Sequence, residues 1–453
     1  MSQGVGIPQT SKGKVASIAP EQFPFRFPTS PRRMGGMLSV EQTTRRLKRI
    51  AVFHHMLMRT LAGWIIEIPE FEVKIELAHH IYMHAEACHS LRQRLIELRV
   101  PPGSSDDFKD EQVTLLQKEI EQSHSAPELI VATQKVTSHL LQAEVQLEKE
   151  TDGLVDLPTI RLLRQIRPDL VEINVWGEAV VQAYMDGGWP EQALVDWGKH
   201  IESMLHYCGG IPGELHECER PRLRQDVEPP FQRKISCARD ERFTTFHHTR
   251  DYRHADQLNS NERGEYERER LELIRVQRDE IDAIETFANV LYDLPSAPFD
   301  LQFDLARFIW DEARHAEMGQ QSLARLGFDP YSVPCGIIGI NVRAPLAPEL
   351  ALAQISIFGE LNMVGRLRRL SQWAYQSNDH PTGIGFDFIH ADELIHLRRG
   401  RAWLKTLNAS DDLTAVQRET RTVAIKRLIE EGVIGEDYAM NLTANEIGEL
   451  IGE

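Results

Sequence analysis

The feature that most constrains the fold of this chain is a helical periodicity that runs through most of its length. From residue 38 onward, apolar residues recur at i, i+3, i+4 and i+7 in long stretches that Pro and Gly interrupt. The alternation of apolar and polar residues that marks a β-strand is rare. We therefore predict an all-α protein. Its 453 residues exceed what one ordinary hydrophobic core accommodates, so we expect two domains.

Changes in composition predict where the domains begin and end. Residues 1–37 are rich in Pro, Ser and Gly and predict an extended N-terminal arm. Residues 205–262 are rich in Pro, Gly and charge and predict an irregular connector or lid. Helical bundles are expected on either side of this connector, over residues 38–204 and 263–409. Residues 410–453 predict a small C-terminal helical segment.

Weak internal repeats indicate that the two bundles are related. The pair Glu86 and His89 lies 226 residues before a second Glu-x-x-His pair at 312–315, and a further similarity has an offset of 137. These registers predict helical hairpins at about residues 42–98, 135–187, 268–327 and 348–408. Because two hairpins make a four-helix bundle, the sequence predicts two four-helix bundles in tandem.

The sequence Asp-Glu-x-x-His occurs twice, at 311–315 and 392–396, within stretches that otherwise read as buried. Residues three positions apart share one face of a helix, so each Glu-His pair is expected to face the bundle interior. Two further Glu residues lie on or beside the apolar stripes of the preceding helices. The predicted inward-facing set is Glu285, Glu312, His315, Glu360, Glu393 and His396.

Four carboxylates and two imidazoles in an apolar interior require compensation. By idealised solvation estimates, an isolated ionised carboxylate in such surroundings costs on the order of tens of kcal/mol. Two divalent cations would neutralise all four carboxylates, and each would receive one imidazole. One Glu from each of two helices plus Glu-x-x-His from the other two is the ligand set of di-iron and di-manganese carboxylate bundles. Oxygen-rich ligation favours iron or manganese over structural zinc. The alternative is a satisfied polar core that holds no metal.

Each Asp-Glu-x-x-His sequence also begins with an acidic residue, Asp311 or Asp392. These side chains point about a quarter turn away from the Glu that follows them. We expect each Asp to reach the histidine of the opposite helix. There its carboxylate would accept the second N–H of a metal-bound imidazole.

These residues together resemble the ferritin-like di-metal carboxylate superfamily: Glu285, DEARH at 311–315, Glu360 and DELIH at 392–396. The resemblance covers residues 268–408 and, as a degenerate copy, residues 42–187. It implies a ferritin-like fold for both bundles, a pair of iron ions or a manganese–iron pair, and O2 as co-substrate.

The function that the resemblance implies is that of an O2-activating non-haem di-iron oxygenase or oxidase acting on a small organic substrate. Hydroxylation, desaturation, N-oxygenation and halogenation all remain open. One alternative is a ferroxidase or iron-handling protein, and another is a non-enzymatic helical scaffold with a relic metal site. The chain contains no flavin or iron–sulfur motif, so electrons are expected from an external donor or from the substrate.

The first bundle departs from this pattern. The repeats place Glu86, His89 and Glu148 at ligand-like positions, with Glu172 as a weaker fourth candidate. Arg59 replaces one of the expected Glu residues, and no Glu-x-x-His closes the second hairpin. An Arg there could neutralise Glu86 without a metal. We therefore expect a degenerate second site in a bundle that serves as a packing platform.

Zinc binding in the connector is a weaker alternative. Cysteines 208, 218 and 237 are accompanied by His206, His216 and the histidines of residues 246–254. Their spacing fits no zinc module. Free cysteines in a lid-like loop are therefore the preferred interpretation.

Charge and composition exclude several classes of partner. The formal net charge of −17 repels nucleic acid and anionic membranes, and no apolar run is long enough to cross a bilayer. The N-terminal sequence has no apolar signal-peptide region, and the five cysteines are scattered, so a cytoplasmic protein is expected. A monomer or homodimer is expected, because a chain of this organisation fits a ferritin cage poorly.

Overall fold

The computed structural model describes residues 35–214, 219–246, 258, 263–408, 413–430, 432 and 434–440. Side chains are described in these ranges except at residues 338, 358, 360–362, 408, 413, 416, 417 and 420. Nearly all of the described secondary structure is helical, which confirms the all-α prediction. Most of the predicted N-terminal arm and the end of the predicted C-terminal segment lie outside the described residues.

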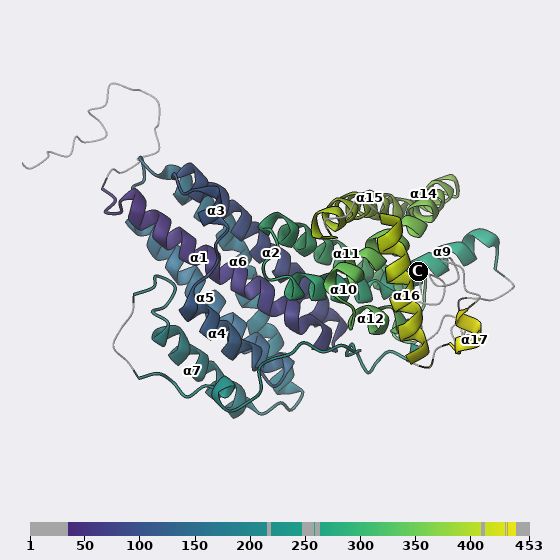
Figure 1. Cartoon of the computed structure of the whole chain (residues 1–453), viewed down its shortest axis with the longest axis horizontal. Coiled ribbons are helices and arrows are strands. Elements are labelled where there is room, and N and C mark those ends of the chain that lie inside the picture. Colours follow the sequence, from purple (N-terminus) through teal and green to yellow (C-terminus); the bar gives the residue numbers. More distant parts are fainter. Residues whose placement is uncertain are drawn as a thin grey trace, which may run out of the picture.

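The first half of the structure is made mainly of long helices that pack against one another (Figure 1). Its elements are α1 (Val40–Trp64), η2 (Ile65–Glu67), α2 (Phe71–Glu97), α3 (Pro102–Ser105), α4 (Glu111–Glu121), α5 (Ala126–Glu150), α6 (Leu157–Asp186) and α7 (Glu191–Tyr207). The connector that follows contains the short helix η3 (Arg224–Asp226) and the strand β1 (Thr245–Phe246).

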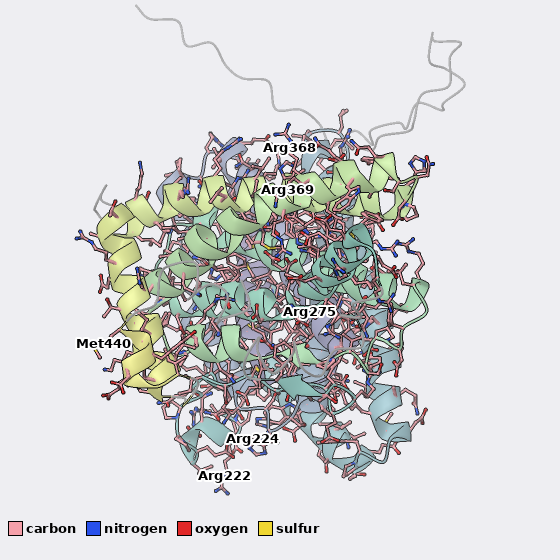
Figure 2. The ribbon with its side chains drawn as sticks, turned by 90° about the vertical axis from the view of Figure 1, so that its right-hand side faces the viewer. Arg222, Arg224, Arg275, Arg368, Arg369 and Met440 are labelled. Atoms are coloured by element: carbon pink, nitrogen blue, oxygen red, sulfur yellow. The ribbon has the colours of Figure 1, made fainter. Side chains whose placement is uncertain are left out.

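The second half contains the other strand and the helices that carry the predicted ligands. Its elements are α9 (Glu265–Asp279), α10 (Ile281–Asp293), α11 (Phe299–Arg325), β2 (Cys335–Gly336), α12 (Ile338–Arg343), α13 (Pro348–Ala353), the π-helix η4 (Gln354–Gly359), α14 (Glu360–Gln376), α15 (His380–Asn408), α16 (Leu413–Glu430) and α17 (Glu436–Ala439). The strands β1 and β2 pair in parallel, which ties the connector to this half. Figure 2 views this half from its outer side, with Met440 at one edge and Arg368 and Arg369 of α14 at the top.

Side-chain caps determine where several helices begin. Ser39 starts α1 with a reciprocal pair of bonds, because its Oγ accepts from the backbone N–H of Gln42 and its own N–H donates to Gln42 Oε1. The side chains of Asp110 and Ser125 accept backbone N–H groups in the same way at the starts of α4 and α5. These caps pair amide groups that the first turn of a helix leaves without a partner.

The two halves share one core. In the first half α1 packs along α2 and α5 along α6, and in the second half α11 packs on α9 and α10 while α14 packs along α15. The halves meet where α1 lies against α10 and α2 against α11. One cluster of buried apolar side chains extends from Leu47 in α1 to Leu404 in α15. The division into two tandem bundles therefore remains a prediction.

Arg59 joins the halves in a way that the sequence did not indicate. Its guanidinium donates to the main-chain oxygens of Leu291 at 2.9 Å and Tyr292 at 2.6 Å, near the C-terminal end of α10. A helix C-terminus favours a cation because its last carbonyl groups lack helical partners. The sequence left open that Arg59 neutralises Glu86, but in the structure Arg59 caps α10.

Two close helix contacts in the second half require glycine. A Cβ on Gly319 of α11 would lie 2.3 Å from the backbone nitrogen of Arg278 in α9, and a Cβ on Gly400 of α15 would lie 2.4 Å from Ser356 Oγ in η4. Each glycine lies four residues after the histidine of an Asp-Glu-x-x-His sequence. The absence of a Cβ thus lets α9 and η4 approach the helices that carry these sequences.

The connector and α16 pack against the helices described above. After α7, the described part of the connector is mostly irregular and lies partly against the first half, where the N–H of Ala238 donates to the carbonyl of Ile66 at 2.9 Å. The helix α16 packs against α12, α13 and η4. None of the described helices combines the length and apolar character needed to cross a membrane.

Candidate metal centre

The helices α11 and α15 bring the two Asp-Glu-x-x-His sequences together. Glu312 and His315 lie on α11, Glu393 and His396 lie on α15, and each of these four residues is at most 3 % exposed. The three-residue spacing places both members of each pair on one helix face, as expected from the sequence. The structure therefore places four of the six predicted ligands in one buried group.

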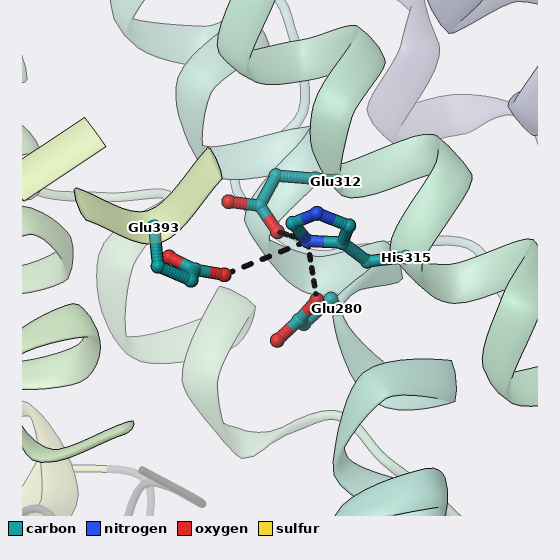
Figure 3. A group of neighbouring side chains, drawn as sticks. All are labelled: Glu280, Glu312, His315 and Glu393. Atoms are coloured by element: carbon teal, nitrogen blue, oxygen red, sulfur yellow. Dashed lines mark hydrogen bonds and ion pairs between the residues drawn. The ribbon is translucent and has the colours of Figure 1, made fainter. Parts of the chain in front are cut away.

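Glu280 is the fifth member of this group. It is the single residue between α9 and α10, with φ −65° and ψ 0°, so the helix changes direction at this position. Figure 3 shows Glu280, Glu312, His315 and Glu393 pointing toward one point from three segments of the chain. One potential ligand atom from each of these four side chains lies within 4.8 Å of the others, a spacing at which they could hold a metal ion.

The two histidines occupy equivalent places in this group. His315 Nδ1 lies 3.0 Å from Glu280 Oε2, 3.4 Å from Glu312 Oε2 and 3.5 Å from Glu393 Oε1. His396 Nδ1 lies 3.1 Å from Glu312 Oε1 and 3.6 Å from Glu393 Oε2. Glu312 and Glu393 thus each direct one oxygen toward His315 and the other toward His396. Carboxylates in this position can each bridge two cations.

The outer nitrogens of the histidines face aspartates of the opposite helix. His315 Nε2 lies 3.4 Å from Asp392 Oδ2, and His396 Nε2 lies 3.2 Å from Asp311 Oδ2. This is the crossed arrangement that the sequence predicted. Arg314 donates to both aspartates, so it fixes their positions relative to each other. An Nε2–H that donates to a carboxylate leaves Nδ1 directed at the centre.

In this structure, bound protons balance the negative charge of the buried carboxylates. Burial, with the charge of Glu312 beside it, raises the pKa of Glu280 well above its usual value. Burial opposes ionisation of Glu312, but bonds from His315 and His396 outweigh it and lower the pKa of this carboxyl to about 2. Burial opposes protonation of both histidines, but the contacts of His315 with Asp392 and Glu280, and of His396 with Asp311 and Glu312, raise the pKa of each imidazole well above its usual value. A cation would displace these protons.

The donor set fits a metal pair. Three carboxylates and two imidazole Nδ1 atoms converge in a nearly dry interior, and oxygen-rich ligation of this kind suits iron or manganese. Glu393 Oε2 is buried and accepts no hydrogen bond within the described structure. A buried carboxylate oxygen without a donor is energetically unfavourable unless a cation satisfies it.

Glu285, which the sequence analysis assigned as a ligand, lies elsewhere. Its carboxylate forms a fully buried ion pair with Lys74 of α2 and accepts from Arg239 of the connector. Burial lowers the pKa of Lys74, and the Glu285 carboxylate partly opposes this effect. Glu285 therefore links α10 to α2 and to the connector. Glu280 occupies the place in the buried group that was predicted for Glu285.

The prediction selected Glu285 because it lies at the edge of the apolar stripe of Ile281, Ile284, Ala288 and Leu291, all of which belong to α10. Glu280 lies just before this helix. Two signals favoured Glu280. It lies four residues before Ile284 on that stripe, and its 32-residue distance to Glu312 matches the 33 residues between Glu360 and Glu393. Glu285 lies only 27 residues before Glu312.

The side chain of Glu360, the remaining predicted ligand, lies outside the described residues. Its backbone is the first residue of α14 and follows η4 directly. Such single π-helical turns are uncommon and occur frequently at functional sites. Glu360 therefore remains a predicted ligand.

The predicted second site does not assemble in the first half. Glu86 is exposed and accepts from Tyr82, and His89 stacks on Phe303 at a centroid distance of 4.7 Å. Glu148 pairs with Arg164 and Arg167, and Glu172 is exposed. No cluster of metal-binding type that includes any of these four residues occurs in the described part of the chain.

A different polar group lies inside the first half. His54 Nδ1 lies 2.9 Å from His84 Nδ1, and His54 Nε2 lies 3.5 Å from Glu144 Oε1. Burial and the adjacent His54 lower the pKa of His84 well below its usual value, and burial raises the pKa of Glu144. His54 faces its two partners with opposite ring nitrogens, so the three side chains do not converge on one point. By the 226-residue repeat, His54 corresponds to Glu280.

The zinc alternative gains no support from the described residues. Cys208 is buried and lies near the carbonyl of Gln112, and Cys237 contacts Asn341. His216 and Cys218 lie outside the described residues. No cluster of metal-binding type that includes Cys208 or Cys237 occurs in the part of the chain that the structure describes.

Comparisons with protein-family models, curated proteins and solved structures found no match for this chain.

Proposed function

We propose that this protein is a di-iron oxidoreductase that uses O2 to oxidise a small organic substrate. The observation that carries the proposal is that Glu312 and Glu393 each face both His315 and His396. The proposed ligands are Glu280, Glu312, His315, Glu360, Glu393 and His396. The proposed architecture is two ferritin-like four-helix bundles in tandem, of which the second holds the metals.

The side chains of the site have separate tasks in this proposal. Glu312 and Glu393, which each face both histidines, would help to hold both metal ions, and each histidine would hold one ion through Nδ1. Asp392 and Asp311 accept the outer N–H groups, which keeps both imidazoles oriented and neutral once metal displaces the inner protons. Glu280 is the most accessible of the described ligands, with its side chain 14 % exposed, and binds on the side from which small molecules approach.

When bound, a pair of ferrous ions supplies the electrons for O2 reduction, which the side chains of this site cannot supply. The apolar helix faces around the site exclude bulk water. A manganese–iron pair is the alternative metal content, and an external donor or the substrate replenishes the electrons. A cavity between α9, α11 and α15, about one helical turn from the ligands, favours oxidation of an organic substrate over iron storage.

The proposal is tested by anaerobic loading of the purified protein with ferrous iron, followed by metal analysis and O2 consumption. We expect two irons per chain and rapid O2 uptake. Glu312→Gln and His396→Gln should each reduce the iron content by at least one ion. Glu86→Gln, an exposed control on α2, should leave it unchanged. Iron content near zero in the wild-type protein, or equal in all four proteins, would refute the proposal.

A further inference from the structure

A cavity of about 370 Å³ opens one helical turn from the ligands, between α9, α11 and α15. Gln277 lines it three residues before Glu280, Gly319 lines it four residues after His315, and Ile389 lines it four residues before Glu393. Because α11 runs antiparallel to α9 and α15, all three lining residues lie toward the same end of these helices, relative to the ligands. The cavity thus begins about one helical turn from the proposed ligands and lies toward that end of the helices.

The inner end of the cavity carries an acceptor without a donor. Gln277 is 1 % exposed, and its Nε2 donates to Glu280 Oε1 at 2.8 Å. Its Oε1 is buried and accepts no hydrogen bond within the described structure. A buried carbonyl oxygen in this state is satisfied when a bound molecule supplies a hydroxyl or amine N–H.

The middle of the cavity is apolar, and its outer end is positively charged. Ile274, Met318 and Phe386 contribute to the walls. At the outer end, Arg325 donates to Thr382 Oγ1 at 3.2 Å and lies 3.8 Å from Asp379. Asp379 is more closely held by Arg270, at 2.8 Å. Two guanidinium groups and one carboxylate therefore leave excess positive charge beside the opening.

We propose that this cavity binds an organic anion with an apolar body, a carboxylate at the Arg325 end and a hydroxyl or amine at the Gln277 end. The inference rests on the proposed function, because it makes this molecule the substrate of the metal centre. Gly319 and Arg325 are separated by about 9 Å at 1.5 Å per helical residue. This span accommodates a chain of roughly eight carbon atoms, and the volume is that of a small-molecule site.

Calorimetric titration of the purified protein with three related probes, before and after anaerobic loading with ferrous iron, tests this inference. The probes are 8-hydroxyoctanoate, octanoate, which lacks the terminal donor, and 1,8-octanediol, which lacks the anion. We expect 8-hydroxyoctanoate to bind roughly fivefold more tightly than octanoate, because only it satisfies Gln277. Arg325→Gln should weaken its binding roughly fivefold and leave 1,8-octanediol unaffected. Arg368→Gln, exposed on α14 (Figure 2), is the matched control.

A second variant blocks the cavity without a backbone clash. A Cβ on Gly385 would meet only Met318 Cε, at 3.8 Å, so the Leu side chain of Gly385→Leu is accommodated by extending into the cavity. Leu also has a higher helix propensity than Gly, so α15 should remain folded. We expect Gly385→Leu to abolish binding of all three probes and to retain iron.

The outcomes separate this inference from the proposed function. Iron uptake without probe binding, equal affinity for the three probes, or binding that survives Gly385→Leu would overturn the inference and leave the metal centre intact. Failure of iron uptake with the expected order of probe affinities would instead overturn the proposed function and support the cavity's ligand class.

Discussion

Replacing Glu285 distinguishes a structural carboxylate from a metal ligand. Glu285 and Lys74 are both 0 % exposed, and the Arg239 side chain that also contacts Glu285 is 5 % exposed. Glu285→Gln would leave two buried cations without their counter-charge. Removal of one partner of a buried ion pair destabilises proteins by about 3–5 kcal/mol. We therefore expect a loss of this size in the free energy of unfolding and no loss of iron.

Chemical unfolding monitored by circular dichroism, with metal analysis of the same samples, measures both quantities. The pKa of Lys74 already lies below its usual value because of burial, and loss of Glu285 should lower it further. The unfolded chain then binds more protons than the folded one, so stability of the variant should rise with pH below the unfolded pKa of about 10.4. Glu86→Gln should change stability by less than about 0.5 kcal/mol.

The result that would refute this reasoning is the opposite pattern. If Glu285→Gln lost iron and kept its stability, Glu285 would be the ligand that the sequence suggested. Glu280→Gln provides the complementary variant, and we expect it to lose iron with a much smaller effect on folding.

Two further predictions concern packing and buried histidines. Gly319→Ala should destabilise the protein by about 1–3 kcal/mol and weaken iron binding, because its Cβ would lie 2.3 Å from the backbone of α9 just before Glu280. Gly365→Ala is the control, because its Cβ would meet only Arg369, at 3.7 Å. Equal effects of the two substitutions would contradict this prediction. Burial lowers the pKa of His80 to about 3, so the unfolded chain takes up a proton below pH 6.5 that the folded chain does not. His80 by itself should therefore lower the free energy of unfolding by about 1.6 kcal/mol between pH 6.5 and pH 5, in addition to the effects of the other buried histidines. His80→Leu should reduce the pH dependence measured by urea unfolding by this amount, whereas an unchanged pH dependence would show that His80 does not contribute.

The sequence was sufficient for the parts of the site that depend on helical periodicity alone. The spacing within each Asp-Glu-x-x-His sequence determines which face carries Glu312 and His315, and the quarter turn to Asp311 leads to the crossed contact with His396. Both follow from 3.6 residues per turn.

The sequence was insufficient where tertiary contacts decide the position of a side chain. Glu285 was selected from the apolar stripe of α10, whereas Glu280, which joins the buried group, is the single residue between α9 and α10. In the first half, Glu148 forms ion pairs with arginines of α6, and the buried polar positions are occupied by His54, His84 and Glu144. Periodicity identifies the inward face, but it does not identify the partner that each polar group meets there.

Anomalous diffraction at the iron absorption edge, from crystals of iron-loaded protein, tests the central idea most directly. We expect two strong peaks, one beside Nδ1 of His315 and one beside Nδ1 of His396, with Glu312 and Glu393 between them. Crystals of iron-loaded protein that show no peak among these side chains, or peaks only at the protein surface, would contradict it.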